Sequence, residues 1–119
     1  GVSGTVDIFE QYRSGLKDLA GFSHLILLYH FHRSPGFELQ VVLFLDSKLR
    51  GFFATRAPKR PNPIGLSVVK LNRIEKGILH IQDVDILDGT PLLDIKPYVP
   101  EFDVRAEVQT GWYHHRSKK

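Results

Sequence analysis

The sequence predicts a mainly β fold, a single small β-barrel domain with one or two short helices and no Rossmann unit. Three observations predict it. Runs rich in β-branched and aromatic residues recur about every eight to twelve residues. Turn residues separate these runs, and one segment carries helical periodicity. The sequence also lacks a strand, glycine-rich turn and helix in succession, which a Rossmann or P-loop nucleotide site requires.

The expected strands are enriched in Val, Ile, Leu, Phe and Tyr. They cover residues 2–8, 25–32, 37–45, 51–55, 64–74, 78–87 and 92–95. Gly4 indicates a bulge or a sheet edge in the first strand. Glu75-Lys-Gly77 is a short hairpin connection. Asp88-Gly-Thr-Pro91 is a turn, because Asp can bond the backbone that follows it and Gly tolerates a positive φ.

Residues 9–19 carry the helical signal. Phe9, Tyr12, Leu16 and Leu19 are spaced for one apolar face, and Gly21 would end the helix. Two prolines and Phe102 predict an irregular stretch after residue 96. We expect one domain over residues 1–110, followed by a polar, basic tail over residues 111–119.

Composition narrows the class of protein. A chain of 119 residues with 42% hydrophobic and 24% charged residues is typical of one globular domain and not of a disordered chain. The net charge of +3 favours anionic partners. The absence of cysteine excludes disulfides, thiolate zinc sites and cysteine nucleophiles. The longest apolar run, residues 25–29, is too short to span a membrane, and no signal peptide opens the chain, so we expect a cytoplasmic protein.

The segment Arg56-Ala-Pro-Lys-Arg-Pro-Asn-Pro63 combines three cations with three prolines. Proline fixes φ and extends the residue before it, so the segment is a stiff loop. In polyproline geometry Arg56 and Arg60 would project about 12 Å apart, with Lys59 close by. Such a loop can grip two groups of one anion. The alternative, a solvated basic turn between two strands, has equal weight from the residues alone.

Two further groups of polar residues are candidates for chemistry. Four aspartates surround the predicted turn, where a carboxylate can bind ribose hydroxyls or polarise an amine; they are Asp83, Asp85, Asp88 and Asp94. A plain turn is the stronger reading of them. Three histidines share a strand face, namely His24, His30 and His32. Hydrogen bonding or stacking is favoured over zinc, and His32-Arg33 suits a heterocycle. The serines at 23, 34 and 67 have no acid–base partner in the sequence, which disfavours serine hydrolysis.

The motifs taken in order resemble one family. They are Gly21-Phe-Ser-His24, Phe31-His32, Gly51-Phe-Phe-Ala-Thr-Arg56, Arg60-Pro-Asn-Pro-Ile-Gly65, Asp88-Gly-Thr-Pro91 and Asp94-Ile-Lys-Pro-Tyr98. Together they resemble the TsaA-like, or TrmO, family of tRNA N6-methyltransferases, from about Gly21 to Asp103. The order and spacing of the last four motifs make the resemblance specific.

The resemblance implies a β-barrel methyltransferase that acts as a homodimer. It would transfer the methyl group of S-adenosylmethionine to N6 of a threonylcarbamoyl-modified adenosine beside the anticodon of threonine tRNA, without a metal. It also implies a further strand ahead of Gly1. Alternatives are a non-catalytic RNA-binding barrel and a small-molecule methyltransferase with the same cofactor.

By motif match, the resemblance implies roles for particular residues. The cofactor-contacting positions are His32, Arg33, Arg56, Leu66, Ile86, Leu87, Asp88 and Gly89. Candidates for contact with the RNA substrate are Lys59, Arg60, Asn62, Lys96 and Tyr98. Asp88 or Asp94 would receive the proton that the acceptor nitrogen loses.

Overall fold

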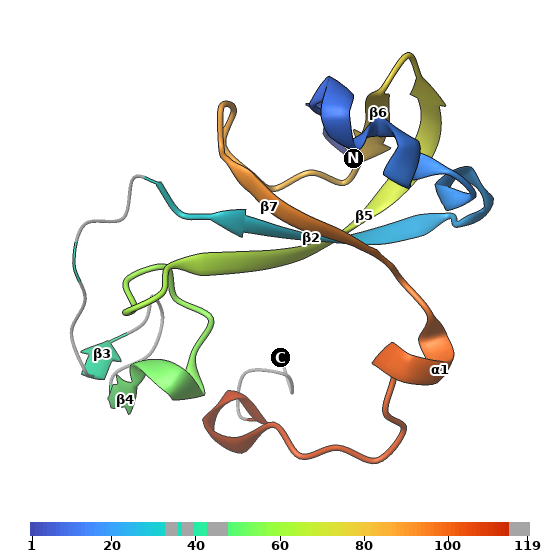
Figure 1. Cartoon of the computed structure of the whole chain (residues 1–119). Helices are drawn as coiled ribbons and strands as arrows, with labels where there is room; N and C mark the ends of the chain where they lie inside the picture. The colour runs from blue at the N-terminus through green and yellow to red at the C-terminus, as the bar shows by residue number, and fades with distance from the viewer. Residues whose placement is uncertain (33–35, 37–39, 43–47, 115–119) are drawn as a thin grey trace.

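A five-stranded antiparallel sheet forms the centre of the computed structural model, which describes residues 1–32, 36, 40–42 and 48–114 (Figure 1). The strands lie in the order β1-β6-β5-β2-β7. Their bounds are β1 Ser3–Asp7, β2 His24–His30, β5 Ile64–Glu75, β6 Ile78–Gln82 and β7 Leu92–Pro97. The mainly β prediction is confirmed, and β1 is an edge strand, as Gly4 indicated.

Two connections of the sheet follow from local chemistry. β5 and β6 form a hairpin in which Lys76 and Gly77 both have positive φ, of 51° and 78°. Two such residues make the tight turn that matches the twist of paired strands. β6 ends at Gln82, because Asp83 has a left-handed φ of 68°. The expected strand over residues 78–87 is therefore too long, and residues 83–91 instead form a segment that joins β6 to β7.

Alternation along the strands separates a core face from an open face. On β2, Leu25, Leu27 and Tyr29 are buried and the residues between them are half-buried. Val69 and Leu71 of β5 join them on the core face, with Leu79 and Ile81 of β6. The side chains on the opposite face of β5 are partly exposed: Ile64 is 47%, Leu66 45% and Val68 42% exposed.

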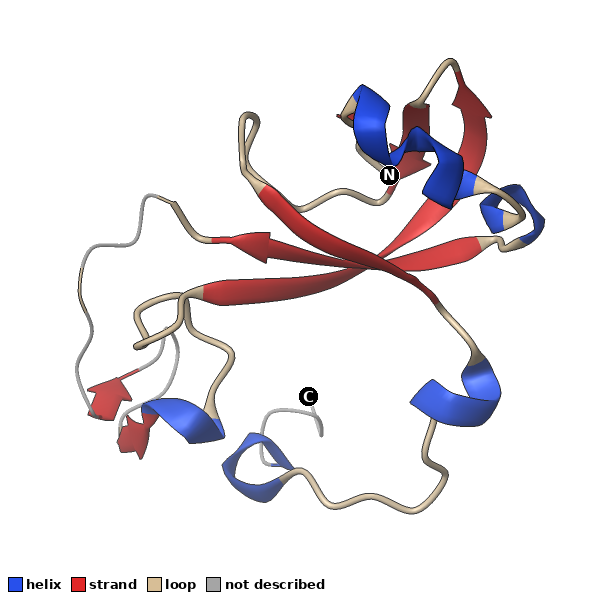
Figure 2. Cartoon of the chain, in the orientation of Figure 1, coloured by secondary structure: helices blue, strands red, loops and turns tan. Residues whose placement is uncertain are grey.

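The short helix expected over residues 9–19 is present as 3-10 structure and not as one continuous helix. The structure has two 3-10 segments there, η1 Glu10–Leu16 and η2 Leu19–Gly21 (Figure 2). Asp18 interrupts them with a left-handed φ of 69°. Leu16 and Leu19 pack on the core, whereas Phe9 is 72% and Tyr12 64% exposed. The supposed apolar face is thus buried only over its second half, too short a stretch to stabilise an α-helix by packing.

The expected strand over residues 51–55 is also wrong. β3 Gln40–Val42 pairs with β4 Leu49–Gly51, and the chain then turns into the 3-10 segment η3 Phe52–Ala54. Phe52 is buried, and the Thr55 hydroxyl donates to the Phe52 carbonyl (2.8 Å), which closes this turn. The remainder of the predicted strand over residues 37–45 lies outside the described residues, apart from β3.

Among the residues that the structure describes, β1 and β7 do not pair, so the sheet is not closed into a barrel. After β7 the chain forms α1 Pro100–Asp103 and η4 Gly111–Tyr113. The Trp112 indole N–H donates to the Ala54 carbonyl (2.7 Å), and the Arg50 guanidinium lies 5.3 Å from the centre of the indole ring. Trp112, the second residue of the expected tail, therefore contacts η3. No helix in the described ranges is long and apolar enough to cross a membrane.

Candidate functional site

One edge of β5 is open over residues 64–69. β6 pairs with β5 only from Lys70 to Glu75, so residues 64–69 pair with β2 alone. The Phe31 amide donates to the Pro63 carbonyl (2.7 Å), and the Leu71 amide donates to the Ser23 carbonyl (2.8 Å). The backbone N–H and C=O groups of the odd-numbered residues of β5 therefore point toward β2. Because bonding direction alternates along a strand, the Leu66 carbonyl points to the open edge.

Arg56 lies at this open edge of β5. Its guanidinium donates from Nη2 to the Leu66 carbonyl at 3.0 Å. The donor caps a backbone acceptor that no strand reaches, while the exposed remainder of the guanidinium keeps its positive charge at the site. Leu66 itself is 45% exposed on the open face of the sheet. Two residues predicted to contact the cofactor are therefore in direct contact.

A second cation shapes the proline-rich loop. Arg60 donates from Nη1 to the Thr55 carbonyl (2.8 Å) and to the Ala57 carbonyl (3.1 Å). The half-buried guanidinium closes the loop upon itself, whereas Lys59 and Asn62 are exposed. The loop is thus held by prolines and by Arg60 together. Lys59 is the more accessible cation for a phosphate.

The 83–91 segment contacts β5 at Ser67, the residue after Leu66. The Ser67 hydroxyl donates to Oδ1 of Asp85 at 2.7 Å, and the Tyr29 hydroxyl lies 2.7 Å from the same Ser67 oxygen. Tyr29 and Ser67 are each 7% exposed. Asp85 was one of the four candidate aspartates, but neither Tyr29 nor Ser67 was predicted to contact the cofactor or the RNA. The available signal was a serine on the core face of an apolar strand, two residues after Gly65.

Gly65 makes room for this arrangement. It lies opposite Tyr29 in the β2–β5 register, and a Cβ at residue 65 would overlap the Tyr29 and Phe31 rings. The two rings meet edge to face with centres 5.5 Å apart. The glycine that ends the proline-rich motif is therefore required by close packing across the sheet.

The predicted turn begins three residues after Asp85. The Leu87 carbonyl accepts bonds from the Thr90 amide (3.2 Å) and hydroxyl (2.6 Å). Ile86 packs on the core, while Leu87 is 64% exposed and Asp88 is exposed. Gly89 has a φ of 79° and open space where a Cβ would lie, so its backbone is accessible. The turn and the positive φ of Gly89 are confirmed, whereas the bonds that close the turn are made by Thr90 and not by the Asp88 side chain.

The end of β2 lies beside both segments. The His30 amide donates to the Pro91 carbonyl (3.0 Å), and the Phe31 amide donates to the Pro63 carbonyl (2.7 Å). These bonds hold the ends of the 83–91 segment and of the proline-rich loop next to the two residues that precede His32. His32 itself is exposed. Arg33 lies outside the described residues.

Three other predicted residues lie on or next to β7, across β2 from Arg56. Asp94 pairs with Leu28 and Lys96 with Ile26 in the β2–β7 register. Lys96 Nζ lies 2.9 Å from Oδ2 of Asp94, and this hydrogen bond holds the pKa of Asp94 below its ordinary value. Tyr98 stacks edge to face on His24, with ring centres 6.4 Å apart. The structure does not bring these residues to the open edge of β5.

The three histidines of β2 and its continuation are also separated. His24 and His30 occupy opposite ends of a seven-residue strand, which places them about 20 Å apart at 3.3 Å per residue. They cannot share one metal ion. Within the described parts of the chain, no three metal-ligating side chains gather.

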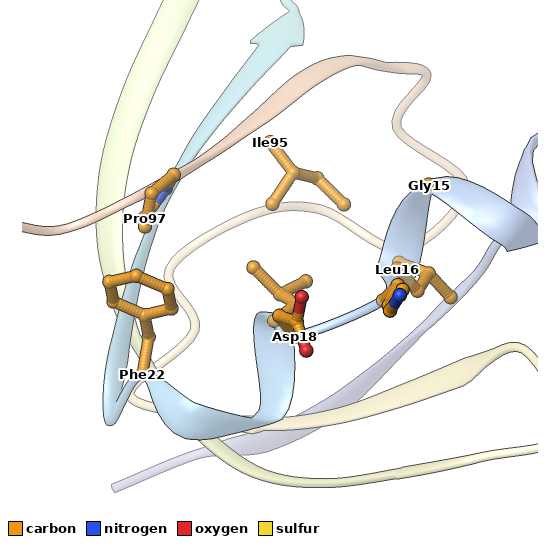
Figure 3. A pocket seen from close by; sticks show the side chains of 8 residues that line it. Gly15, Leu16, Asp18, Phe22, Ile95 and Pro97 are labelled. Carbon is orange, nitrogen blue, oxygen red and sulfur yellow. The ribbon is translucent and has the colours of Figure 1, made fainter.

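A pocket of about 280 Å³ lies elsewhere, between the 3-10 segments and β7 (Figure 3). Its apolar lining comes from Leu16, Leu19, Phe22, Ile95 and Pro97. None of the predicted cofactor residues lines it.

Residues 1–104 match the family model described as the tRNA-methyltransferase O N-terminal domain. The chain belongs to this TrmO family. A crystal structure of TrmO from Pseudomonas aeruginosa superposes with a TM-score of 0.76 at 40% identity, over 92% of this chain and 48% of that one.

TrmO-family relatives carry two kinds of name. A probable S-adenosyl-L-methionine-binding protein of Pyrococcus abyssi is 60% identical over 93% of this chain and 60% of its own length. A tRNA (adenine(37)-N6)-methyltransferase of Mus musculus is 36% identical over 92% of this chain and 26% of its own length. This chain thus spans three fifths or less of these relatives.

Proposed function

We propose that this chain carries the S-adenosylmethionine site of a tRNA (adenine-N6) methyltransferase. The observation that carries the proposal is the convergence of Arg56 and the 83–91 segment on two successive residues of β5, Leu66 and Ser67. Both segments belong to motifs shared with the TrmO family. Relatives named as cofactor-binding proteins and as tRNA methyltransferases support it.

The side chains present fit the chemistry of the cofactor. Its α-carboxylate needs a cation, which Arg56 supplies, and its adenosine needs apolar surface and hydrogen bonds. Leu66 and Leu87 are exposed apolar side chains, and the open backbone at Gly89 can approach a ligand closely. When bound, S-adenosylmethionine supplies an electrophilic methyl group on a sulfonium. We place it at the open edge of β5, with Ile86, Asp88, His32 and Arg33 as further contacts.

The acceptor amine loses one proton during methylation, and a carboxylate or water receives it. Asp88 is exposed in the turn next to the proposed cofactor contacts. Asp94 is engaged by Lys96, which lowers its pKa and makes it a poorer proton acceptor. We therefore favour Asp88 over Asp94. Much of the rate acceleration would come from aligning the two substrates, which binding residues can provide.

The finer proposal concerns the acceptor and the assembly. We propose N6 of threonylcarbamoyl-adenosine beside the anticodon of threonine tRNA, in the cytoplasm, as the acceptor. A base in an anticodon loop is single-stranded and enters a pocket at lower cost than a base in a duplex. Lys59, Arg60 and Asn62 lie in the proline-rich loop, beside the proposed cofactor site. Lys96 and Tyr98 are more distant candidates for RNA contact.

We also propose a homodimer. The radius of gyration is 16.5 Å, against about 13.5 Å for a compact chain of this length. β3, β4, α1 and η4 extend away from the sheet (Figure 1). On the open face of β5, Ile64 and Val68 are partly exposed on either side of Leu66, which we assign to the cofactor. A second copy that packs on this face would bury them.

The functional test uses labelled S-adenosylmethionine and tRNA with or without the threonylcarbamoyl group. We expect label on N6 only in the modified tRNA. Arg56→Ala should weaken cofactor binding about 10-fold in a calorimetric titration, because a charge-assisted contact is lost. Arg105→Ala, which removes an exposed arginine outside the site, is the matched control. Cofactor binding without any tRNA labelling would contradict the proposed acceptor, and RNA binding without cofactor affinity would indicate a non-catalytic RNA-binding protein.

A further inference from the structure

The hydroxyl chain of Tyr29, Ser67 and Asp85 has a fixed direction. An ionised carboxylate only accepts hydrogen bonds, so the single Ser67 hydroxyl proton is donated to Asp85. Tyr29 must then donate its own proton to Ser67. Both hydroxyls are almost completely buried, and a buried hydroxyl without a partner is costly. The sheet therefore presents one donor, the Ser67 hydroxyl, to the carboxylate, and the Tyr29 hydroxyl holds that donor in place.

This carboxylate anchors the 83–91 segment to β5 through a side-chain hydrogen bond, next to the core packing of Val84 and Ile86. Backbone bonds hold the segment near its ends, from the Val84 amide to the Val2 carbonyl (3.1 Å) and from the His30 amide to the Pro91 carbonyl (3.0 Å). Between these bonds, the contact from Ser67 to Asp85 ties the segment to β5. Asp85 immediately precedes Ile86, where the proposed cofactor contacts begin.

We propose that Asp85 is a positioning residue for the cofactor, held by Ser67 and, through Ser67, by Tyr29. The anchor sets the distance between the 86–89 turn and Arg56, because Arg56 is bonded to Leu66 and Asp85 to Ser67. One strand thereby fixes both walls of the site. This inference rests on the proposed function and adds three residues to it.

The Ser67–Asp85 hydrogen bond can be distinguished by experiment from a contact that serves stability alone. Loss of a contact that serves global stability alone speeds exchange of the core amides of β2 and β5, which open only on unfolding. Loss of this anchor should release the 83–91 segment while β5 and β2 stay paired. Amide hydrogen exchange at Val84 and Thr90, two hydrogen-bonded amides of this segment, reports that release without any cofactor.

The test compares Asp85→Ala with Asp85→Asn in the whole 119-residue chain. Asparagine keeps an oxygen that accepts the Ser67 bond, whereas alanine removes the acceptor. Asp85→Ala and Ser67→Ala should speed exchange of the Val84 and Thr90 amides and weaken S-adenosylmethionine binding about 10-fold or more, as expected for a lost hydrogen bond to a charged group. Asp85→Asn should restore the parent exchange rate of these two amides and stay within about 3-fold of the parent affinity. Asp7→Ala, at an exposed ion pair with Arg13, is the control.

Each outcome decides between positioning and its alternatives. If Asp85→Asn is as defective as Asp85→Ala in affinity but normal in exchange, the negative charge contacts the ligand and the positioning role is wrong. If Asp85→Ala has normal exchange and normal affinity, the anchor is not needed and the inference is also wrong. If the parent chain does not bind the cofactor, the proposed function fails, and the exchange comparison still tests the anchor separately.

Discussion

Asp94 and Lys96 lie on the same face of β7, two residues apart, and their side chains meet at 2.9 Å. The hydrogen bond from Lys96 is the largest cause of the lowered pKa of Asp94, and the Ile95 amide adds to it. Both side chains are about half exposed, so the pair contributes little to stability. Its main effect is to keep Asp94 ionised.

The lowered pKa predicts a pH dependence. The stabilisation from ionised Asp94 is present above its unfolded pKa, near 3.8, and is lost as the pH falls through the lower folded value. Lys96→Gln should raise the Asp94 pKa toward its ordinary value, as measured by NMR titration of the carboxyl carbon. Asp94→Asn should leave the shape of the methylation pH profile near neutrality unchanged. A profile that loses its acidic limb in this variant would make Asp94 the proton acceptor.

At the scale of elements, the three cations of the proline-rich loop do not all point outward to bind an anion. Arg60 bonds the carbonyls of Thr55 and Ala57 and so acts inside the loop, while Lys59 projects from it. Arg56 turns to the strand that follows. Three neighbouring cations thus have three different surroundings, which their spacing in the sequence did not distinguish.

This division predicts separable effects on binding. Lys59→Gln should reduce the salt dependence of tRNA affinity by about one unit of log–log slope, as for one lost phosphate contact, and leave cofactor affinity unchanged. Arg60→Gln should loosen the loop that carries Arg56 and weaken cofactor binding as well. Fluorescence titrations over a salt series and calorimetry measure the two effects. A pure change of salt slope in Arg60→Gln would show that Arg60 serves the phosphate alone.

At the scale of the whole molecule, the extents of 47 × 35 × 23 Å describe an elongated chain around one small core. The core face of the sheet is covered by η1, η2 and the 83–91 segment. The other face of β5 carries three partly exposed aliphatic residues in a row, Ile64, Leu66 and Val68. A chain with these features has much apolar surface for a partner to bury.

The proposed dimer predicts a specific sensitivity on this face. Val68→Glu should shift the protein from dimer to monomer in sedimentation at micromolar concentration, because a charge would be buried at the interface. Phe9→Glu places the same charge on a more exposed apolar site just after β1, 72% against 42% exposed for Val68, and should leave the dimer intact. A urea transition for each variant separates dissociation from unfolding. A parent chain that sediments as a monomer would remove the dimer from the proposal.

The strands were predicted from local pattern because alternation and turn chemistry act over few residues. β2, β5, the Lys76–Gly77 hairpin and the Asp88–Pro91 turn all follow from such signals. Local pattern was less informative for residues 9–19. Helical spacing does not show which apolar side chains reach the core, and here Phe9 and Tyr12 stay exposed. Similarly, Gly51 to Thr55 has strand composition but bends into η3 around buried Phe52.

The sequence by itself determined the composition of the site, namely a stiff cationic loop, an aspartate-rich turn and a histidine at a strand end, in an order that resembles one family. Only the tertiary structure decided which of these residues meet. Arg56 and Asp85 are 29 residues apart in the sequence, yet both reach successive residues of β5, because β6 stops short and leaves that edge open. Likewise Ser67 gained the partners that its sequence neighbourhood lacked, since strand pairing and Gly65 place Tyr29 beside it. Contacts of this kind depend on register and on chain crossings, which no local pattern encodes.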